Sequence, residues 1–416
     1  MSEENSLRRR VIDYIKKRKE KVENGGINTI PSPFKRFSND FIGIEQGKYY
    51  LVTGQTKAGK SQVTTFIFLY NTLMYAYKHP EQVRLKIFYY PLEETPEEIM
   101  FRFMSYYLYI NSSFEIDVSP EDLKSSKEDK PISQSIIDLL ESEEYSNMLD
   151  YFESHITFSP SRNPTGIYNE VKAFMQNNGT IHYKTSQIKD ELGLAREVKS
   201  FDYYEPNDPD LYTIVIVDHI SLITPEKITN SNQVMTLKQA IDKVSEYCVI
   251  LRNRYNVTPV IVQQQSVESE SNDSVKLGRI RPSIGNLSDS KYTSKDANVI
   301  LGIFSPFRFE LTEYLGYNIK ILQDNFRLIE VIINRGGSPG GTIGLYFNGK
   351  CNYFRELPLP NSTAMQSIYS YFTKKPKESN STSMSFFSFN IKNSCEKLYI
   401  WKIFHKFAAF YKKIMF

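Results

Sequence analysis

The chain has 416 residues, of which 40% are hydrophobic and 24% charged, a balance that can bury the core of one large domain or of two. The formal net charge of +3 excludes a global basic field, so any contact with phosphate groups must come from local patches. The widely spaced Cys248, Cys351 and Cys395 exclude a disulfide framework and a zinc site. A polar start and the lack of a long apolar run exclude a signal peptide and a membrane span, so we expect a cytoplasmic protein.

The first predicted element is a basic helix within residues 1–26, which a break at Gly25 and Gly26 ends. One of its faces carries residues that recur at helical spacing, namely Leu7, Val11, Tyr14, Ile15, Arg18 and Val22. An apolar stripe on a short helix must be covered. Either the chain's own core or a neighbouring subunit of an assembly would cover it.

Residues 27–356 alternate apolar strand-like runs with helical stretches, which predicts an α/β domain with a mostly parallel central sheet flanked by helices. The expected strands are residues 49–53, 86–90, 156–158, 213–217, 259–262, 297–303 and 328–333, followed by an antiparallel pair at 342–347 and 351–355. Residues 111–135 and 179–211 are predicted insertions. Beyond the domain we expect a linker over 357–385 and a basic, aromatic tail over 386–416.

A phosphate-binding loop is the strongest motif in the chain. The pattern GxxxxGK[ST] is met by Gly54, Gln55, Thr56, Lys57, Ala58, Gly59, Lys60 and Ser61, with Gln62 directly after it. An apolar strand precedes the motif and a helix follows it, which is the context that such a loop requires. Backbone N–H groups and the helix N-terminus would wrap the phosphates of ATP. Lys60 would bridge the β- and γ-phosphates, and Ser61 would bind Mg²⁺.

Two further acidic positions complete a hydrolytic site in the sequence. Asp218 ends the apolar run 212–217, so it lies at the carboxyl end of a buried strand and would hold the Mg²⁺ shell. Glu93 and Glu94 follow another strand, and either could orient the attacking water. Acids at the first turn of a helix also favour the helix dipole, which would explain both without catalysis.

At this point the motifs resemble those of the motor domain of DnaB-type replicative DNA helicases. The matching segments, in family order, are YPLEETPEEIMFRF (90–103), IVIVDHISLI (214–223), TPVIVQQQ (258–265), the stretch from Arg281-Pro282 to Asp296-Ala297, and IINRGGSPGGT (332–342). The resemblance implies Glu93 as the catalytic glutamate, Gln265 as the sensor of the γ-phosphate and Arg335 as an arginine finger that acts on a neighbouring subunit. It covers roughly residues 27–350.

The family implies a RecA-like fold, a homo-oligomer in the form of a hexameric ring, and ATP bound with Mg²⁺ at subunit interfaces. It further implies 5′–3′ translocation on single-stranded DNA during replication in a bacterial or phage-infected cell, with a primase or helicase loader as a further partner. Channel-lining loops would be residues 266–287 and 224–234, with phosphate contacts from Lys276, Arg279, Arg281 and Lys291.

Three departures from the family pattern keep other functions open. The family's KQR is reduced to Asn334-Arg335, Ser288 stands where the family has a DNA-contacting arginine, and only residues 1–26 precede the motor. A RecA-type recombinase filament shares the same nucleotide motifs. A ring ATPase that serves as a replication scaffold without translocating is the other alternative.

Overall fold

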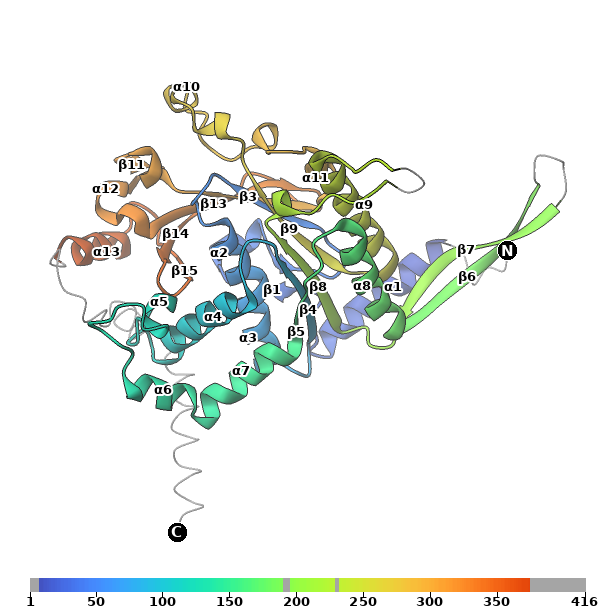
Figure 1. Cartoon of the computed structure of the whole chain (residues 1–416), viewed down its shortest axis with the longest axis horizontal. Coiled ribbons are helices and arrows are strands. Elements are labelled where there is room, and N and C mark those ends of the chain that lie inside the picture. The colour runs from blue at the N-terminus through green and yellow to red at the C-terminus, as the bar shows by residue number, and fades with distance from the viewer. Residues whose placement is uncertain (1–6, 190–194, 229–231, 375–416) are drawn as a thin grey trace, which may run out of the picture.

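A computed structural model describes residues 7–189, 195–228 and 232–374. The expected tail over 386–416 lies outside the described residues. A nine-stranded sheet forms the centre of the molecule, with the strand order β15-β14-β13-β10-β3-β9-β8-β4-β5 (Figure 1). The six strands from β10 to β5 run parallel, whereas β13, β14 and β15 are antiparallel to their neighbours. The prediction of a mostly parallel sheet is therefore confirmed.

Every predicted strand is present in this sheet, with ends shifted by a few residues. The strands are β3 (Tyr50–Gly54), β4 (Arg84–Pro91), β5 (Ile156–Phe158), β8 (Leu211–Asp218), β9 (Thr258–Gln264), β10 (Val299–Phe304), β13 (Phe326–Asn334), β14 (Thr342–Asn348) and β15 (Tyr353–Glu356). The central strands are buried on both faces, which explains their nearly continuous apolar sequences.

Helices cover both faces of the sheet, and the alternation of side chains along each strand divides the core in two. In β8, Ile214 and Ile216 pack into one cluster, while Val215 and Val217 pack into the other. The first cluster is completed by α2 (Lys60–Thr64), η3 (Thr65–Tyr70), α3 (Asn71–Lys78), α4 (Pro96–Asn111) and α7 (Glu143–His155). The second is completed by α8 (Pro164–Asn177) and α9 (Leu237–Tyr255).

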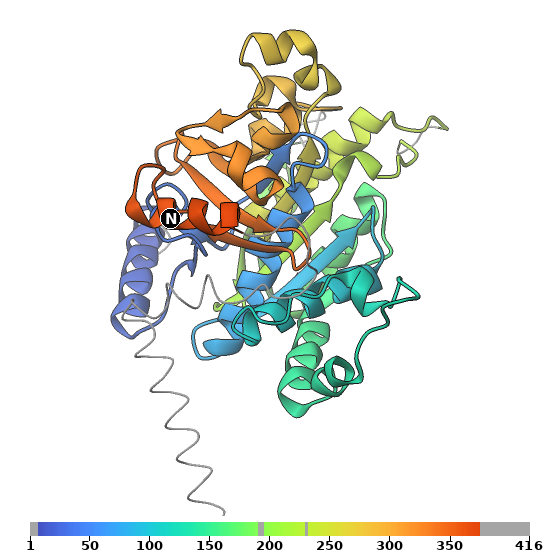
Figure 2. The same ribbon diagram turned by 90° about the vertical axis from the view of Figure 1, so that its left-hand side faces the viewer.

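The predicted N-terminal helix forms as α1 (Leu7–Glu23) and lies at the margin of the molecule (Figure 2). Ion pairs join Arg18 to Glu45 and Lys21 to Asp210, so its second half is tied to the amino-end edge of the sheet. Its apolar stripe is nevertheless exposed, with Ile15 59% accessible. Within the part of the chain that the structure describes, this stripe is therefore left uncovered.

The second predicted insertion contains a long β-hairpin made by β6 (Gly179–Lys189) and β7 (Ala195–Pro206). The hairpin projects from the body of the molecule like an arm (Figure 1). Only its base joins the core, where Ile181 and Tyr204 pack against the second cluster and the Tyr204 hydroxyl donates to the Met175 carbonyl. The outer part is held by the ladder between its own two strands.

The structure differs from the prediction of a linker over residues 357–385. Within that range α13 (Thr363–Lys374) is a helix whose Met365, Ile368 and Tyr369 are buried. They form a third cluster with residues at the carboxyl end of β10 and the start of β13. Residues 363–374 therefore belong to the folded body, because three apolar side chains at helical spacing find a surface to cover.

Short elements connect these parts of the fold. They are β1 (Ile30–Pro31), β2 (Gly43–Ile44), η2 (Arg36–Asn39), α5 (Pro120–Leu123), α6 (Gln134–Leu140), η4 (Ile220–Leu222), η5 (Val267–Glu270), α10 (Asn272–Lys276), η6 (Ile284–Asn286), α11 (Tyr292–Asp296), η7 (Pro306–Phe309), β11 (Glu313–Tyr314), β12 (Tyr317–Asn318), α12 (Ile319–Leu322) and η8 (Gln323–Asn325). No helix in the part of the chain that the structure describes is long and apolar enough to cross a membrane.

Candidate nucleotide site

The phosphate-binding loop lies between β3 and α2, at the carboxyl end of the parallel strands. Gly59 has a φ of +103°, a conformation that glycine adopts without strain and that lets the chain turn into α2. Gly54 lies so close to β10 that a Cβ atom there would be 2.5 Å from the Ile303 carbonyl oxygen. Both glycines are thus required by the backbone path, and the loop has the shape of a phosphate cradle.

Lys60 is the buried cation of this loop. Its ammonium donates to the Gln55 carbonyl oxygen of the loop at 3.1 Å. Burial lowers the pKa of Lys60 to about 8, against the opposing attraction of Asp218 and Glu93. An anion beside a buried lysine stabilises the charged form of that lysine. The position of Lys60 therefore fits the phosphates of a nucleotide.

Ser61 and Asp218 meet as a metal site would require. The Ser61 hydroxyl donates to Asp218 Oδ1 at 3.0 Å, and the Tyr89 hydroxyl donates to Oδ2 at 3.3 Å. Asp218 is 4% exposed, and burial raises its pKa to about 7. One hydroxyl and one carboxylate suit Mg²⁺, which completes its shell with phosphate oxygens and water. The described residues contain no cluster of three or more His, Cys, Asp or Glu side chains, the set that a transition metal would use.

The structure separates the two glutamates that the sequence left as alternatives. Glu94 forms a two-pronged ion pair with Arg102 on α4. Glu93 is exposed, and among the described residues no hydrogen bond or ion pair occupies its carboxylate. Its charge nevertheless acts on Lys60 and on Asp218, so it lies on the side of the phosphate loop. Glu93 is therefore the carboxylate that remains available to a water molecule.

Gln265 follows β9 directly, next to the phosphate loop. Its backbone N–H donates to the Gly54 carbonyl at 3.0 Å. Its side-chain amide donates to the Thr53 hydroxyl at 2.8 Å and accepts from the Ser283 backbone N–H at 3.0 Å. The side chain thus connects the strand that leads into the phosphate loop with the polar segment 266–287.

The preceding residue, Gln264, is a site residue that the sequence analysis missed. Its amide group donates to the hydroxyl of Thr56 in the phosphate loop, and its amide oxygen lies 3.2 Å from His219 Nε2. Desolvation by burial lowers the pKa of His219, so this ring serves as a neutral hydrogen-bonding partner. Strand alternation could have identified Gln264, because three consecutive glutamines cannot all face the same side.

Arg335 lies at the end of the sheet where the parallel strands begin, whereas the phosphate loop of its own chain lies where they end. Asn334 pairs with Val299 at the start of β10, and Val299 pairs with Tyr50 at the start of β3. The guanidinium donates to the Lys295 carbonyl oxygen, and the residue is exposed. Arg335 is therefore not brought together with Lys60, Ser61, Glu93 and Asp218 within one chain.

A second missed residue, Arg327, reaches the phosphate loop from β13. It is 3% exposed, and its Nε donates to the Ala58 carbonyl oxygen at 2.9 Å. The guanidinium also stacks on Phe347 and pairs with Asp324 at 3.0 Å. A charged residue inside the apolar run 326–333 was the available sequence signal for a buried, partnered arginine.

The segment 266–287 carries some of the cations that were expected to contact DNA. Lys276 and Arg279 are exposed on it, and α10 stands at the top edge of the molecule (Figure 1). Arg281 instead pairs with Glu330 at 3.7 Å and stacks on Tyr314. The Ser288 hydroxyl donates to the Gln264 carbonyl at 2.9 Å. In the other expected loop, 224–234, residues 229–231 lie outside the described part of the chain.

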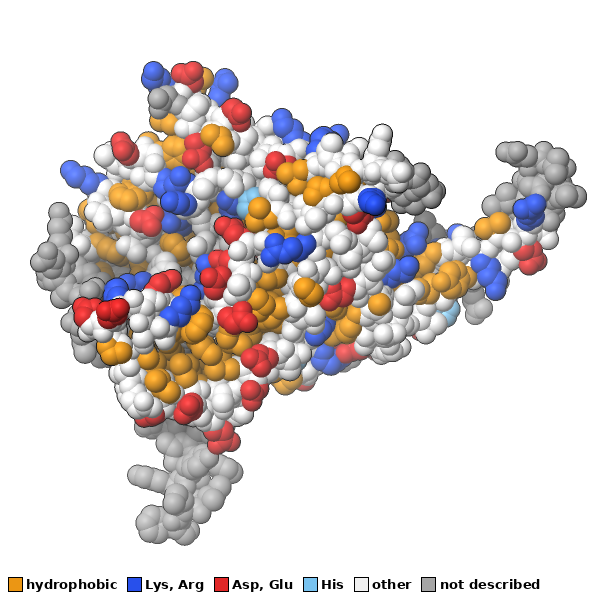
Figure 3. Space-filling model, viewed as in Figure 1, with side chains coloured by type: hydrophobic (Ala, Val, Ile, Leu, Met, Phe, Trp, Pro, Cys, Tyr) orange, Lys and Arg blue, Asp and Glu red, His pale blue; other side chains and the backbone are white. Residues whose placement is uncertain are grey.

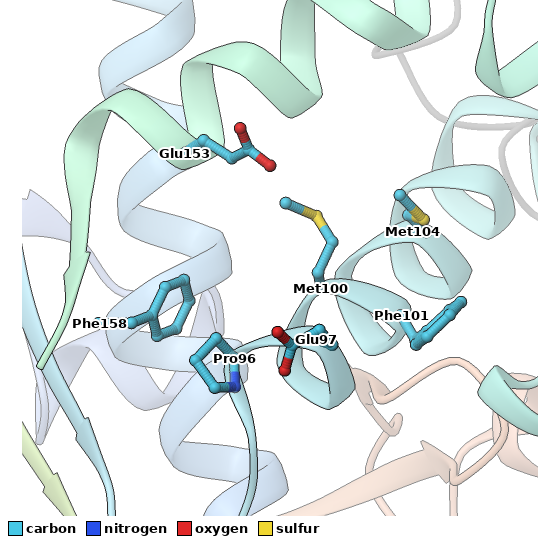
Figure 4. Close-up of a pocket in the computed structure, with 7 residues that line it drawn as sticks. All are labelled: Pro96, Glu97, Met100, Phe101, Met104, Glu153 and Phe158. Atoms are coloured by element: carbon cyan, nitrogen blue, oxygen red, sulfur yellow. The ribbon is translucent and has the colours of Figure 1, made fainter. Parts of the chain in front are cut away.

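A separate hollow of about 370 Å³ lies between α4, α7 and β5 (Figure 4). Its lining is mostly apolar and consists of Pro96, Glu97, Met100, Phe101, Met104, Glu153 and Phe158. Figure 3 shows hydrophobic side chains gathered on this face, with acidic side chains around them. Two carboxylates and no cation make the hollow unsuitable for phosphate, so it is distinct from the nucleotide site.

Comparisons with known proteins agree on the architecture. No protein-family model matches the sequence, and no curated protein sequence matches it. Among solved structures, an isolated ATPase domain aligns with a TM-score of 0.55 at 15% identity, over 85% of this chain and 99% of that one. A DnaB-like replicative helicase studied with primase aligns with a TM-score of 0.55 at 15% identity, over 82% of this chain and 66% of that one. Identity this low establishes the fold alone: the chain has the RecA-like fold of the ATPase domain of DnaB-like helicases.

Proposed function

We propose that this chain is an ATP-dependent DNA helicase of the DnaB-like type, which hydrolyses ATP between the subunits of a ring and moves along single-stranded DNA during replication. One observation carries the proposed ATP hydrolysis: Lys60, the Ser61–Asp218 pair and the free Glu93 carboxylate lie together at the glycine-containing phosphate loop. This combination of cation, metal site and free carboxylate is what phosphoryl transfer to water requires. The fold, which is similar to the ATPase domain of DnaB-like helicases, supports the helicase part.

Each of these residues has a defined role in the proposed site. Residues 54–62 would wrap the phosphates of ATP, with Lys60 between the β- and γ-phosphates. Ser61 and Asp218 would hold Mg²⁺, which supplies charge neutralisation during transfer of the phosphoryl group. Glu93 would accept hydrogen bonds from the attacking water and orient it. Gln265 would pass the state of the γ-phosphate to segment 266–287 through its contact with Ser283.

Two features support assembly of identical subunits. Arg335 faces away from its own phosphate loop, so it would serve as the finger for a neighbour's site. The exposed apolar stripe of α1 offers a surface that a neighbouring subunit would cover. A hexameric ring is the closed form that the family resemblance implies, and a primase or helicase loader remains a proposed partner.

The test is the rate of ATP hydrolysis with and without single-stranded DNA, in the wild type and in Lys60→Ala. We expect DNA to stimulate the wild type several-fold, and we expect the variant to lose at least about a hundredfold in rate. Equal rates for the two proteins would refute the proposal. A strand-displacement assay on forked DNA then separates a translocating helicase from a scaffold ATPase, which would hydrolyse ATP without unwinding.

A further inference from the structure

Two charged residues that the proposed mechanism does not use flank the phosphate loop. In the sheet, β3 lies between β9 and β10, so the segments that follow these two strands border the loop on either side. Glu270 lies at the end of η5, which follows β9, and Arg308 lies in η7, which follows β10. Strand order, rather than nearness in sequence, brings the two residues together.

The Glu270 carboxylate binds the phosphate loop as an anion would. Its Oε1 accepts a hydrogen bond from the Thr56 backbone N–H at 3.1 Å, and its Oε2 lies 3.5 Å from Arg308 Nη2. The negative charge of Glu270 also favours the protonated form of Lys60. A carboxylate that contacts a loop N–H and a guanidinium, close to the loop lysine, presents the same acceptor chemistry as a phosphate oxygen.

Arg308 has hydrogen-bonding capacity that the described structure leaves unused. Its Nη1 atom is buried and has no hydrogen-bond partner among the described residues. A buried unpaired donor is costly, and more so on a charged group, so such a donor commonly marks the place of a missing partner. The charge of Arg308 also acts on Lys60 and on Arg327, which places it on the phosphate-loop side of η7.

We propose that Arg308 binds the terminal phosphate of the nucleotide within its own subunit, and that Glu270 holds this position until the triphosphate displaces it. The inference rests on the proposed function, because it assigns a further residue to the same site. A terminal phosphate carries more charge than a carboxylate and offers three oxygens, so it satisfies both Nη atoms and the Thr56 N–H. A diphosphate does not reach this position, and Glu270 stays in place when ADP is bound.

Displacement of Glu270 has a consequence for the segment that carries Lys276 and Arg279. The contact with Thr56 fastens the start of segment 266–287 to the phosphate loop. When the triphosphate replaces Glu270, this fastening is lost, and the exposed cations gain freedom to meet the phosphates of a nucleic acid. Nucleotide state and the conformation of the segment are thereby coupled through one carboxylate.

The first experiment measures the dissociation constants of Mg-ATPγS and Mg-ADP by calorimetry, without DNA. We expect Arg308→Ala to weaken ATPγS binding about tenfold or more and to leave ADP binding within about twofold, because one charge-assisted hydrogen-bonding group is lost. Arg308→Lys should recover part of the loss. Glu270→Gln should tighten ATPγS binding several-fold, because the competing anion is removed. Lys320→Ala, an exposed cation on the neighbouring α12, is the matched control and should change neither constant.

The outcomes separate this inference from the proposed function. If the wild type binds neither nucleotide, the proposed function itself fails. If the wild type binds both, but Arg308→Ala weakens them equally or not at all while its thermal unfolding matches the wild type, only the role of Arg308 is refuted. A variant that unfolds early is replaced by Arg308→Lys, for which an unchanged ratio of the two constants counts against the proposal.

A second experiment follows tryptic cleavage after Lys276 and Arg279. We expect ATPγS to accelerate this cleavage in the wild type and ADP to leave it unchanged. Glu270→Ala should be cleaved rapidly without nucleotide, because it removes the oxygen that accepts the Thr56 N–H and so frees the segment. Cleavage that is equally fast in both proteins and in both nucleotides would refute the coupling.

Discussion

Glu93 and Glu94 are neighbours in sequence with opposite surroundings. The Arg102 guanidinium forms an ion pair with the Glu94 carboxylate, whereas Glu93 is exposed on the side of Lys60 and Asp218. Burial raises the pKa of Glu94 above its usual range, and only the pairing with Arg102 opposes this effect. The two carboxylates therefore differ in function: one is a candidate base, and the other fastens the start of α4.

This difference predicts two distinct variants. Glu93→Gln should lower the rate of ATP hydrolysis by at least about a hundredfold and leave ATP affinity nearly unchanged, because a general base is lost. Glu94→Gln should keep the rate within a few-fold of the wild type but lower the free energy of unfolding by about 1–3 kcal/mol, because a charged hydrogen-bonded pair is broken. Steady-state kinetics with urea unfolding measures both, and the opposite assignment of effects would contradict this interpretation.

A surface ion pair gives a prediction about pH. Arg84 at the start of β4 pairs with Asp208, and this hydrogen bond holds the pKa of Asp208 below its usual range. A lowered carboxyl pKa stabilises the fold above the unfolded value of about 3.9, and the contribution is lost as the pH falls through the folded value. Because the pair is partly exposed, we expect Arg84→Ala to cost about 0.5–1 kcal/mol.

The measurement is urea unfolding of the wild type and Arg84→Ala at several pH values. The difference in unfolding free energy should be constant from about pH 7 to 5 and should shrink below about pH 4. A difference that persists unchanged in acid would mean that Arg84 acts through packing of its aliphatic part rather than through charge.

The sequence pointed to those candidate site residues that belong to local motifs. Lys60, Ser61 and Asp218 could be assigned because the phosphate loop and the strand-end aspartate are defined by spacing and by a single strand. Gln264, Arg327 and the Glu270–Arg308 pair could not, because their contacts depend on which strands lie beside β3. Strand order follows from the three-dimensional fold and is only weakly encoded in any one segment.

At the level of elements, the parallel core was predictable and its additions were less so. The buried strands are continuous apolar runs of fixed length, so β3, β8 and β9 could be located within a few residues. The arm formed by β6 and β7 was expected only as a charged insertion, because its two faces are both largely exposed and no apolar alternation identifies it. For α13, the helical spacing of Met365, Ile368 and Tyr369 is visible in the sequence, but the surface of the core on which the helix packs could not be predicted from it.

The arm should be dispensable for folding. Replacing residues 184–200 by a short glycine-containing turn should leave the thermal midpoint within a few degrees of the wild type, since the side chains that pack on the body, Ile181, Phe201 and Tyr204, lie at the base of the arm. The midpoint can be measured by circular dichroism. A collapse of the cooperative transition would show that the arm supports the body.

Helix α13 should behave in the opposite way. Met365 is fully buried in the third cluster, so Met365→Ala should lower the free energy of unfolding by about 2–5 kcal/mol. The exposed Gln366→Ala on the same helix is the matched control and should change stability by less than about 0.5 kcal/mol. Equal, small effects of both substitutions would indicate that α13 is not docked in solution.

At the scale of the whole molecule, the candidate nucleotide site lies where the parallel strands end, whereas Arg335 lies where they begin. If Arg335 completes a neighbour's site, Lys60→Ala and Arg335→Ala subunits carry complementary defects. Each protein alone should lose at least about a hundredfold in ATP hydrolysis.

Mixing the two variants in equal amounts, under conditions that allow subunits to exchange, should restore activity. Random mixing leaves about one quarter of the interfaces with an intact Lys60 facing an intact Arg335. The rate should therefore rise well above that of either variant alone. No recovery after proven exchange would contradict the assignment of Arg335 to a neighbouring site.

If Arg335 acts on a neighbouring copy, its separation from the phosphate loop also gives every copy a direction. A copy that offers its loop at one edge and its arginine at the other can only add partners head to tail. An open row of such copies always ends in one loop without an arginine and one arginine without a loop. Only a closed circle lets each copy supply its arginine to one neighbour and use the arginine of the other. The number of complete catalytic centres would then equal the number of copies in a circle, and would be one fewer than the number of copies in an open row.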